Sequence, residues 1–286
     1  MLPFLGFIAA LFHFWGNGIG WLDIALFVAF YLITGFGVTV GYHRLFTHRS
    51  FKAVPWLETL LGVAGCAAVQ GPILSWVADH RRHHQHSDHE GDPHSPHLFD
   101  DHGLLGTLGG LWHSHIGWLF EAGSTDAQRY APDLLKDKRL SRIDSLYGLW
   151  LLLSLLAPAV LAYAITGGST EAAISAVLFA GLARVFLLHH VTWSVNSICH
   201  SFGKRAYRTT DESRNNAIVG VIGLGEGWHN NHHAFPTSAR HGLGKGQFDL
   251  SWELIRLFVR LGWVTKVQLP TEQLLQRKAM EPAAAE

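Results

Sequence analysis

The sequence is poor in charged residues, since Asp, Glu, Lys and Arg make up 15% of the 286 residues, against about a quarter in soluble domains. Its 22 basic and 22 acidic residues balance, so it lacks the positive face that nucleic acid requires. The only cysteines, Cys66 and Cys199, exclude a disulfide framework and a thiolate metal site. The N-terminus has no basic region and no small-residue cleavage site, so a retained membrane segment is expected there.

Hydrophobic residues are abundant, at 48%, and they occur in long blocks that favour a membrane. The sequence predicts an all-α integral membrane protein with four transmembrane helices, in the blocks 3–15, 22–41, 146–166 and 172–195. A further apolar stretch, 54–77, lies between two histidine clusters that a single crossing would place on opposite membrane faces. Its polar break QGP predicts that it lies along the interface or doubles back instead.

Basic residues are distributed unevenly around these blocks. The segments 80–145 and 201–214 are rich in Lys and Arg, whereas the turns at 16–21 and 166–171 contain neither. The positive-inside rule therefore predicts that the histidine clusters lie on the cytoplasmic face. Residues 1–270 are expected to form a single domain, and residues 271–286 a polar C-terminal tail.

Two histidine triplets share one spacing. In an α-helix, positions i, i+3 and i+4 lie on one face, so the imidazoles of each triplet can converge on one point. The triplets are His80, His83 and His84 in HRRHH, and His229, His232 and His233 in HNNHH. Because neutral imidazole is the commonest transition-metal ligand, the repeated pattern predicts a metal site.

Further candidate ligands lie at the ends of two predicted spans. Five residues of α-helix leave His43 and His48 roughly 140° apart, so this pair is expected to straddle the end of helix 22–41. Asn196 and His200 share a helix face at the cytoplasmic end of the last block. One four-coordinate zinc would leave most of these histidines unused. Two metals with four or five ligands each fit better, and redox chemistry at a membrane face favours iron.

The motifs GYHRLFTHRSF, DHRRHH, DPHSP, HSHIGWL, TWSVNS and GEGWHNNHHAFP occur in an order that resembles the stearoyl-CoA (Δ9 fatty acyl) desaturases, from about residue 22 to 250. The resemblance implies four spans, an interfacial or re-entrant helix, and a cytosolic helical cap that carries a di-iron centre. The implied iron ligands are His43, His48, His80, His83, His84, His200, His229, His232 and His233, with Asn196 holding a metal-bound water.

The resemblance also implies a kinked acyl tunnel, whose bend is formed by Gln70, Trp76 and Thr192. The implied reaction uses O2 and two electrons to remove two hydrogens from adjacent methylenes, leaving a cis double bond, expected at Δ9. No catalytic side chain is expected beyond the metal centre. Electrons are expected from a separate ferredoxin or cytochrome b5-like protein with its reductase.

The head group of the acyl substrate is less well defined. The resemblance implies basic residues that bind the phosphates of coenzyme A, but this chain has Ala78 and Phe120–Gly123 at those positions. Arg49, Arg81 and Arg82 are the remaining candidates. An acyl-CoA substrate is favoured narrowly, with an acyl-lipid or an acyl carrier protein as alternatives.

Two other functions share parts of this pattern. A di-iron membrane hydroxylase would use the same site and insert oxygen instead, and a metal transporter would place ligands along a path through the spans. Arg184 is expected to pair with a carboxylate or carbonyl group. The remaining histidines are expected to be structural (His113, His115, His189, His190) or to lie in a solvated loop (His86, His89, His94, His97, His102).

Overall fold

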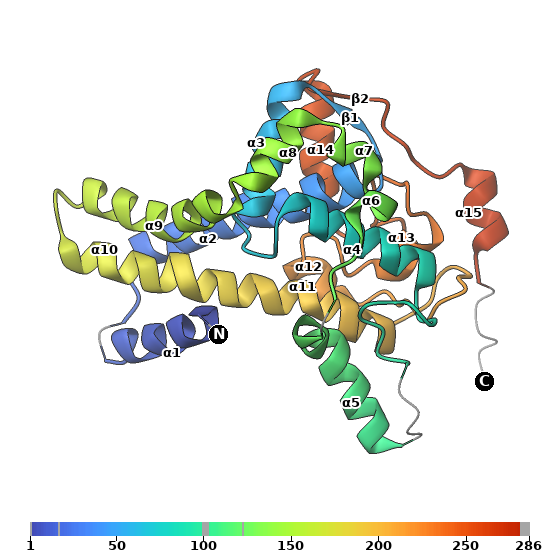
Figure 1. The fold of residues 1–286 in the computed structure, drawn as a ribbon, viewed down its shortest axis with the longest axis horizontal. Coiled ribbons are helices and arrows are strands. Elements are labelled where there is room, and N and C mark those ends of the chain that lie inside the picture. Colours follow the sequence, from blue (N-terminus) through green and yellow to red (C-terminus); the bar gives the residue numbers. More distant parts are fainter. Residues whose placement is uncertain (1, 17, 99–102, 122, 281–286) are drawn as a thin grey trace.

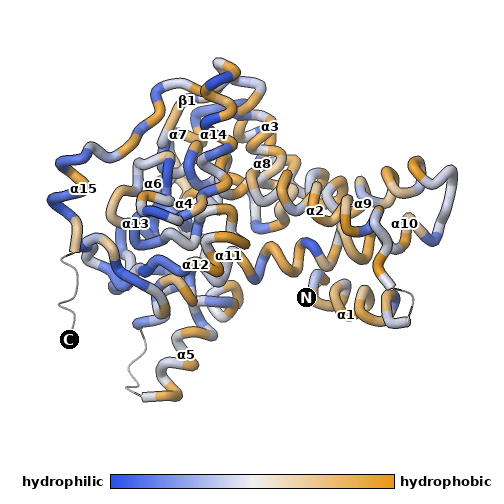
Figure 2. Tube along the Cα trace, turned by 180° about the vertical axis from the view of Figure 1, so that it is seen from behind, coloured by the Kyte–Doolittle hydropathy of each residue, from blue (hydrophilic) through white to orange (hydrophobic). Residues whose placement is uncertain are grey.

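The computed structural model describes residues 2–16, 18–98, 103–121 and 123–280, and it is mostly helical, as expected. Figure 1 shows an elongated arm of helices that joins a wider cap. Figure 2 shows that the arm is predominantly hydrophobic, whereas the cap is mixed. The arm consists of α1 (Leu2–Phe14), α2 (Trp21–Phe36), α9 (Tyr147–Ile165), α10 (Thr170–Ala176) and the adjoining part of α11 (Arg184–Ser201).

Within the described residues, three continuous helices are long and apolar enough to cross a membrane: Trp21–Thr47, Tyr147–Ile165 and Thr170–Ser201. The first contains α2 and the π-helix η1 (Gly37–Thr47), and the third contains α10, the π-helix η3 (Val177–Ala183) and α11. At 27 and 32 residues, these two are about 40 and 48 Å long, which exceeds a hydrocarbon core of about 30 Å. Their ends therefore reach into the cap.

Helix α1 is the fourth apolar helix, but its 13 residues extend only about 20 Å. It packs against η3 in the arm. The structure thus supports three of the four expected spans by length and composition, and the fourth remains a prediction that depends on α1.

Arg184 is fully buried in the arm, among apolar helices. Its guanidinium donates to the Ser154 hydroxyl at 2.7 Å and to the carbonyl oxygens of Ser154 and Ala180 at 3.2 and 3.1 Å. These contacts confirm the carbonyl partner that the sequence predicts. They also connect α11 to α9, which holds the buried charge in a low-dielectric environment.

The apolar stretch 54–77 does not form one helix. Helix α3 (Pro55–Cys66) is about 18 Å long, which is too short to cross a membrane, and α4 (Ile73–His86) begins after a break at residues 67–72. Helix α3 packs closely on η1, where a Cβ atom on Gly37 would lie 2.2 Å from the carbonyl carbon of Ala64. The break lies beside α9 and α11. The start of α3 and the end of α4 belong to the cap, so this arrangement agrees with a segment that doubles back.

The backbone groups of this break bond to residues of the neighbouring helices. The Ser154 hydroxyl donates to the carbonyl of Ala67, and the amide of Gly71 donates to the hydroxyl of Tyr147 at 3.2 Å. The Tyr42 hydroxyl reaches the Gly71 carbonyl at 3.3 Å. Irregular backbone is tolerated at membrane depth only where protein satisfies it in this way.

The cap surrounds an apolar core to which η1, α3 and α4 contribute. A short antiparallel ladder of β1 (Lys52–Ala53) and β2 (Val264–Thr265) departs from the all-α expectation. The other elements of the cap are α5 (Leu104–His115), the 3-10 helix η2 (Gly117–Phe120), α6 (Ala127–Tyr130), α7 (Pro132–Leu135), α8 (Lys138–Ser145), α12 (Ala217–Ile222), α13 (His229–Ala234), α14 (Leu250–Arg260) and α15 (Glu272–Lys278).

The described part of the expected C-terminal tail is ordered on the cap. Helix α15 begins with Thr271 as its N-cap, and the Lys278 amine donates to the carbonyl of Ala234 at 2.7 Å. The backbone carbonyl of Lys278 also accepts from the amide of Arg208. Residues 281–286 lie outside the described residues.

Candidate metal centre

The π-helix η1 decides how His43 and His48 lie. In a π-helix the hydrogen bonds join residues five apart, and the amide of His48 donates to the carbonyl of His43 at 3.1 Å. Five-residue spacing therefore brings the two imidazoles together, with 4.8 Å between ring centroids. The expected end of this helix, at residue 41, is wrong, because the wide turns extend it to Thr47.

The two histidine triplets lie on α4 and at the start of α13, as their spacing predicts. Each triplet, however, is divided between two groups of imidazoles rather than converging on one point. We define the first cluster as His43, His48, His80, His84 and His232, and the second cluster as His83, His200, His229 and His233. Within each cluster the candidate ligand atoms lie within 4.8 Å of one another. The nine expected histidines thus form a set of five and a set of four.

The donor set fits metal ions. In the second cluster, Nδ1 of His83 and Nδ1 of His233 each lie against an aspartate, so their Nε2 atoms are left with bare lone pairs. These two Nε2 atoms face each other at 3.4 Å, so one metal ion could accept both lone pairs when the two imidazoles are neutral. In the first cluster, Nε2 of His232 lies 2.9 Å from that of His84 and 3.0 Å from that of His43. Two bonds of about 2.1 Å that meet at one ion at about 90–110° place their nitrogens about 3.0–3.4 Å apart, which is close to these distances.

Burial keeps several of these imidazoles neutral. It lowers the pKa of His80, His84 and His232 well below 6.5, and the neighbouring imidazoles lower it further. Burial likewise lowers the pKa of His233 to about 4, although Asp211 opposes that shift. Neutral imidazole is the form that binds a metal, so these ligands need lose no proton at pH 7.

Sequence reasoning missed the carboxylates behind the histidines. Four of the nine cluster histidines place Nδ1 against a buried carboxylate: His43 with Glu226 at 2.5 Å, His83 with Asp92 at 2.9 Å, and His200 and His233 with Asp88 and Asp211, both at 2.8 Å. Asp88 and Asp92 lie in HSDHEGDPHSP, which resembles a solvated loop, and Glu226 lies in GEGWHNNHH. Carboxylates close to metal-ligating histidines in the sequence were the available signal, because such ligands usually donate their second N–H.

Arg44 is a second buried residue that the sequence did not single out. Its guanidinium is fully buried and donates to Asp249 at 3.0 Å, to Glu226 at 3.0 Å and to the carbonyl of Ala239 at 2.8 Å. His241 lies in the same group, with Nδ1 3.2 Å from the guanidinium. Arg44 therefore connects η1 to α14 and holds Glu226 beside His43.

Two cavities meet beside the clusters. The larger, of about 930 Å³, extends from the start of α1 past α5 to His80, and it is lined mainly by apolar and aromatic side chains. The smaller, of about 50 Å³, lies between α2, α11 and α12 and borders His43, His80 and His229. Both cavities are lined by Trp76, His80, Thr192 and Asn196. Gln70 borders the larger cavity, and its amide donates to the Thr192 hydroxyl at 2.9 Å, so the expected tunnel residues lie where the cavities meet.

The three candidate head-group arginines have internal partners. The guanidinium of Arg81 donates to the carbonyl oxygens of Phe46 and Thr47 and to Asp133. Arg82 donates to the carbonyl of Gly91 at 2.8 Å. Arg49 also pairs with Asp133, but its side chain is 64% exposed. Among the described residues that line the larger cavity there is no Lys or Arg.

The ion pairs of Asp133 predict an acid-dependent loss of stability. Burial would raise the pKa of Asp133, but Arg81 and Arg49 together lower it to about 2. The carboxylate therefore contributes stability above pH 4, the ordinary value for an unfolded chain, and this contribution is lost as the pH falls through about 2. At pH 7, Asp133→Asn should destabilise the detergent-solubilised protein by roughly 1 kcal/mol, since the site is partly exposed.

Thermal unfolding followed from pH 7 to the lowest pH that the protein tolerates would test this expectation. The difference between the wild type and Asp133→Asn should narrow as the pH falls. A difference that stayed constant with pH would contradict a role for the ionised carboxylate. Asp23→Asn, at the exposed start of α2, is the matched control.

Other histidines are only partly where the sequence predicts them. His94 is buried and stacks on His83 at 4.4 Å, so a solvated loop is wrong for it, whereas His97 is exposed, as expected, although its ring contacts the carbonyl of His200 at 2.8 Å. His115 and His190 contact each other at 2.9 Å, in agreement with a structural role. His102 lies outside the described residues.

Comparisons with known proteins agree with this site. A family model described as "Fatty acid desaturase" matches residues 4–253. The sn-1 stearoyl-lipid 9-desaturase of Anabaena variabilis is 39% identical over 272 residues, which is 94% of this chain and 92% of that protein. The hex-5-enoyl-[acyl-carrier protein] acetylenase of Moorena producens is 40% identical over 282 residues, covering 98% and 87%. The acyl-CoA C20 Δ5-desaturase of Anemone leveillei is 36% identical over 274 residues, covering 94% and 81%.

These relatives differ in the carrier of the acyl chain and in the position of the reaction, but each spans nearly the whole of this chain. The histidine clusters able to hold metal and the three helices long and apolar enough to cross a membrane fit the same chemistry. With a family model that extends over most of its length, the chain belongs to the fatty acid desaturase family.

Proposed function

We propose that this protein is a membrane di-iron desaturase that introduces a cis double bond, at the Δ9 position, into a saturated acyl chain esterified in a glycerolipid. The observation that carries the proposal is an apolar cavity that reaches His80 of the first imidazole cluster and has no Lys or Arg among its described lining residues. The 9-desaturase of Anabaena variabilis, which by its name acts on stearoyl-lipid, supports both the position and the carrier. O2 is the co-substrate, and electrons come from a separate ferredoxin or cytochrome b5-like protein.

The nine cluster histidines would hold two irons, and Asn196, which borders both cavities, would hold a water on one of them. When bound, the iron pair supplies the oxidising power that removes two hydrogens with O2. The protein's own residues position the chain, because adjacent methylenes offer no chemical handle for recognition. Binding energy along the unreactive chain must therefore set which carbons lie beside the clusters.

The junction of the two cavities supports a bent acyl chain. Trp76 borders both cavities and stacks on His80 at 5.1 Å, which fixes one wall beside the first cluster. Across the junction, the side-chain amide of Gln70 donates a hydrogen bond to the hydroxyl of Thr192. The two polar groups therefore satisfy each other beside the apolar cavity. A chain bent at this point favours a cis product.

The lining of the larger cavity favours a lipid over acyl-CoA, the carrier that the sequence narrowly favoured. Phosphates of coenzyme A need cations, and Arg81 and Arg82 are engaged with protein groups instead. Asp79, the acidic residue among the described lining residues, would repel phosphate. The exposed Leu119 and Phe120 lie at the same cavity, where a neutral acyl ester is compatible with the surroundings.

A parallel assay tests the proposed function. The purified protein, supplied with reduced ferredoxin and O2, would be offered stearoyl chains as phospholipid or galactolipid, as acyl-CoA and as acyl carrier protein. We expect turnover of the lipid, with a product that lacks two hydrogens at Δ9. Turnover of acyl-CoA alone, or of acyl carrier protein alone, would overturn the lipid proposal, and a product that gained oxygen would overturn desaturation.

The tunnel residues predict chain-length selectivity. Thr192→Leu adds volume where the cavities meet and removes the hydroxyl that Gln70 bonds. It should shift preference toward shorter acyl chains, by roughly 10-fold or more in the ratio of kcat/KM, as methylene-sized differences in apolar pockets usually do. Products from mixed C16 and C18 lipids would be compared with those of Thr170→Leu, an exposed control at the start of α10. An unchanged product profile would contradict the placement of the tunnel.

A further inference from the structure

The two histidine clusters differ in the carboxylates behind them. In the second cluster, His83, His200 and His233 each place Nδ1 against an aspartate, at 2.8 to 2.9 Å. In the first cluster, only His43 has such a partner, which is Glu226. Within the part of the chain that the structure describes, His48, His80, His84 and His232 have no carboxylate within ion-pair distance.

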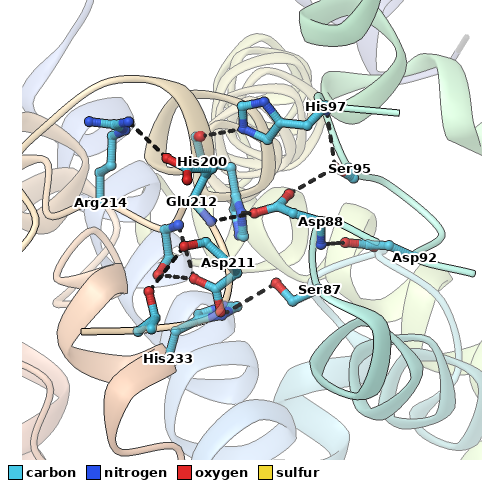
Figure 3. A network of polar contacts seen from close by, with 12 residues as sticks. Ser87, Asp88, Asp92, Ser95, His97, His200, Asp211, Glu212, Arg214 and His233 are labelled. Carbon is cyan, nitrogen blue, oxygen red and sulfur yellow. Dashed lines mark hydrogen bonds and ion pairs between the residues drawn. The ribbon is translucent and has the colours of Figure 1, made fainter. Parts of the chain in front are cut away.

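The three aspartates of the second cluster are held in place by other donors, several of them drawn in Figure 3. Asp88 accepts from the Ser95 hydroxyl and from the amide of Glu212, both at 2.8 Å. Asp92 accepts from the amides of Asp88 and His94 at 2.9 and 3.1 Å. Asp211 accepts from the amide and hydroxyl of Ser213 at 3.0 and 2.5 Å. Because every aspartate has fixed donors, none can rotate away from its imidazole without losing these bonds.

The charges around the clusters also differ. Glu226 accepts from the buried guanidinium of Arg44 at 3.0 Å, which also pairs with Asp249, so part of its charge is neutralised. Beside the second cluster, Arg205 donates to the backbone carbonyl of Asp211 at 2.7 Å rather than to its carboxylate. Arg205 and Arg214 pair with the carboxylate of Glu212. Three carboxylate charges therefore remain behind the second cluster, against one partly compensated charge behind the first.

We propose that the second cluster binds its metal ion more tightly than the first, because three fixed aspartates support its imidazoles. A carboxylate that accepts from Nδ1–H makes Nε2 a stronger electron-pair donor to the metal and fixes the tautomer of the imidazole. It also adds negative charge near the cation. Removing such a partner typically costs 10–100-fold in metal affinity. The inference rests on the proposed metal centre and ranks its two sites.

The ranking has a consequence for partly loaded protein. In the first cluster, His80 borders both cavities and His43 borders the smaller one, whereas His229 is the one second-cluster residue among the described lining residues, at the smaller cavity. The weaker site is then the one beside the substrate cavity. Protein with one equivalent of metal should hold it in the second cluster and be inactive.

Cobalt binding tests the ranking without any assay of activity. The full-length protein, stripped of metal in detergent, would be titrated with Co²⁺ and followed by its visible absorption and by the bound metal content. Two classes of site are expected, separated by at least about 10-fold in Kd. Asp211→Asn should weaken the tight class about 10–100-fold and leave the weak class unchanged, and Asp88→Asn should do the same through His200.

Two controls complete the test. Glu226→Gln should weaken only the weak class, and Glu212→Gln, which removes a carboxylate that contacts no imidazole, should change neither. A single monodisperse peak in size exclusion shows that each variant is folded. Two sites of equal affinity, or an Asp211→Asn effect on both classes or on neither, would overturn the ranking alone. A folded wild type that binds no Co²⁺ would overturn the proposed metal centre as well.

Discussion

His232→Ala should abolish desaturation, with at least about a 100-fold loss of kcat/KM, and reduce bound metal from two equivalents to one. His232 lies between His43 and His84, with its Nε2 atom 3.0 and 2.9 Å from theirs, so its removal leaves the first cluster without its central nitrogen. Loss of a carboxylate behind a ligand already costs 10–100-fold in metal affinity, and loss of the ligand itself should cost more. The remaining equivalent should stay in the second cluster.

The measurement combines metal content per protein with product formation from the preferred substrate. His115→Gln is the matched control, because His115 contacts His190 and Ser197 rather than a cluster, and it should keep both equivalents. A His232→Ala protein with full activity would show that the first cluster is not the reactive centre. Retention of both metal equivalents would show that His232 is not a ligand.

Arg44→Met should have the largest effect on stability, with a loss of about 3–5 kcal/mol. The guanidinium is fully buried and pairs with Asp249 and Glu226, and its removal leaves two buried carboxylates without their cation. For a chain of this size, we expect the unfolding temperature to fall on the order of 10 °C. Since Glu226 supports His43, affinity for metal at the first cluster should fall as well.

Fluorescence-detected size exclusion after heating in detergent measures this change. Arg256→Met is the control, because Arg256 pairs with Glu253 on the exposed face of α14, and surface pairs of this kind contribute little. An Arg44→Met protein as stable as the wild type would mean that the two carboxylates tolerate burial without the guanidinium. The apo protein should show the same order of stabilities, since the pairs of Arg44 involve no metal.

Local spacing in the sequence was sufficient for several features of this protein. The apolar blocks 22–41, 146–166 and 172–195 predicted the helices Trp21–Thr47, Tyr147–Ile165 and Thr170–Ser201, because burial in lipid demands continuous apolar length. The i, i+3, i+4 pattern placed each histidine triplet on one helical face, which α4 and α13 confirm. The QGP break predicted that the stretch 54–77 lies along the interface or doubles back, and its division into α3 and α4 agrees with the second alternative.

Tertiary structure decided how those features combine. Each of α4 and α13 contains one histidine triplet, but the packing of the two helices divides each triplet between the two clusters. Residue spacing within one helix cannot specify this division. The π-helix that brings His43 to His48 packs against α3, and the spacing of the two histidines does not by itself predict its wide turns. Asp88, Asp92 and Asp211 resemble loop residues until the fold buries them against imidazoles. The sequence determined which atoms can bind metal, whereas long-range packing decided which atoms share an ion, because a contact between distant segments has no local period.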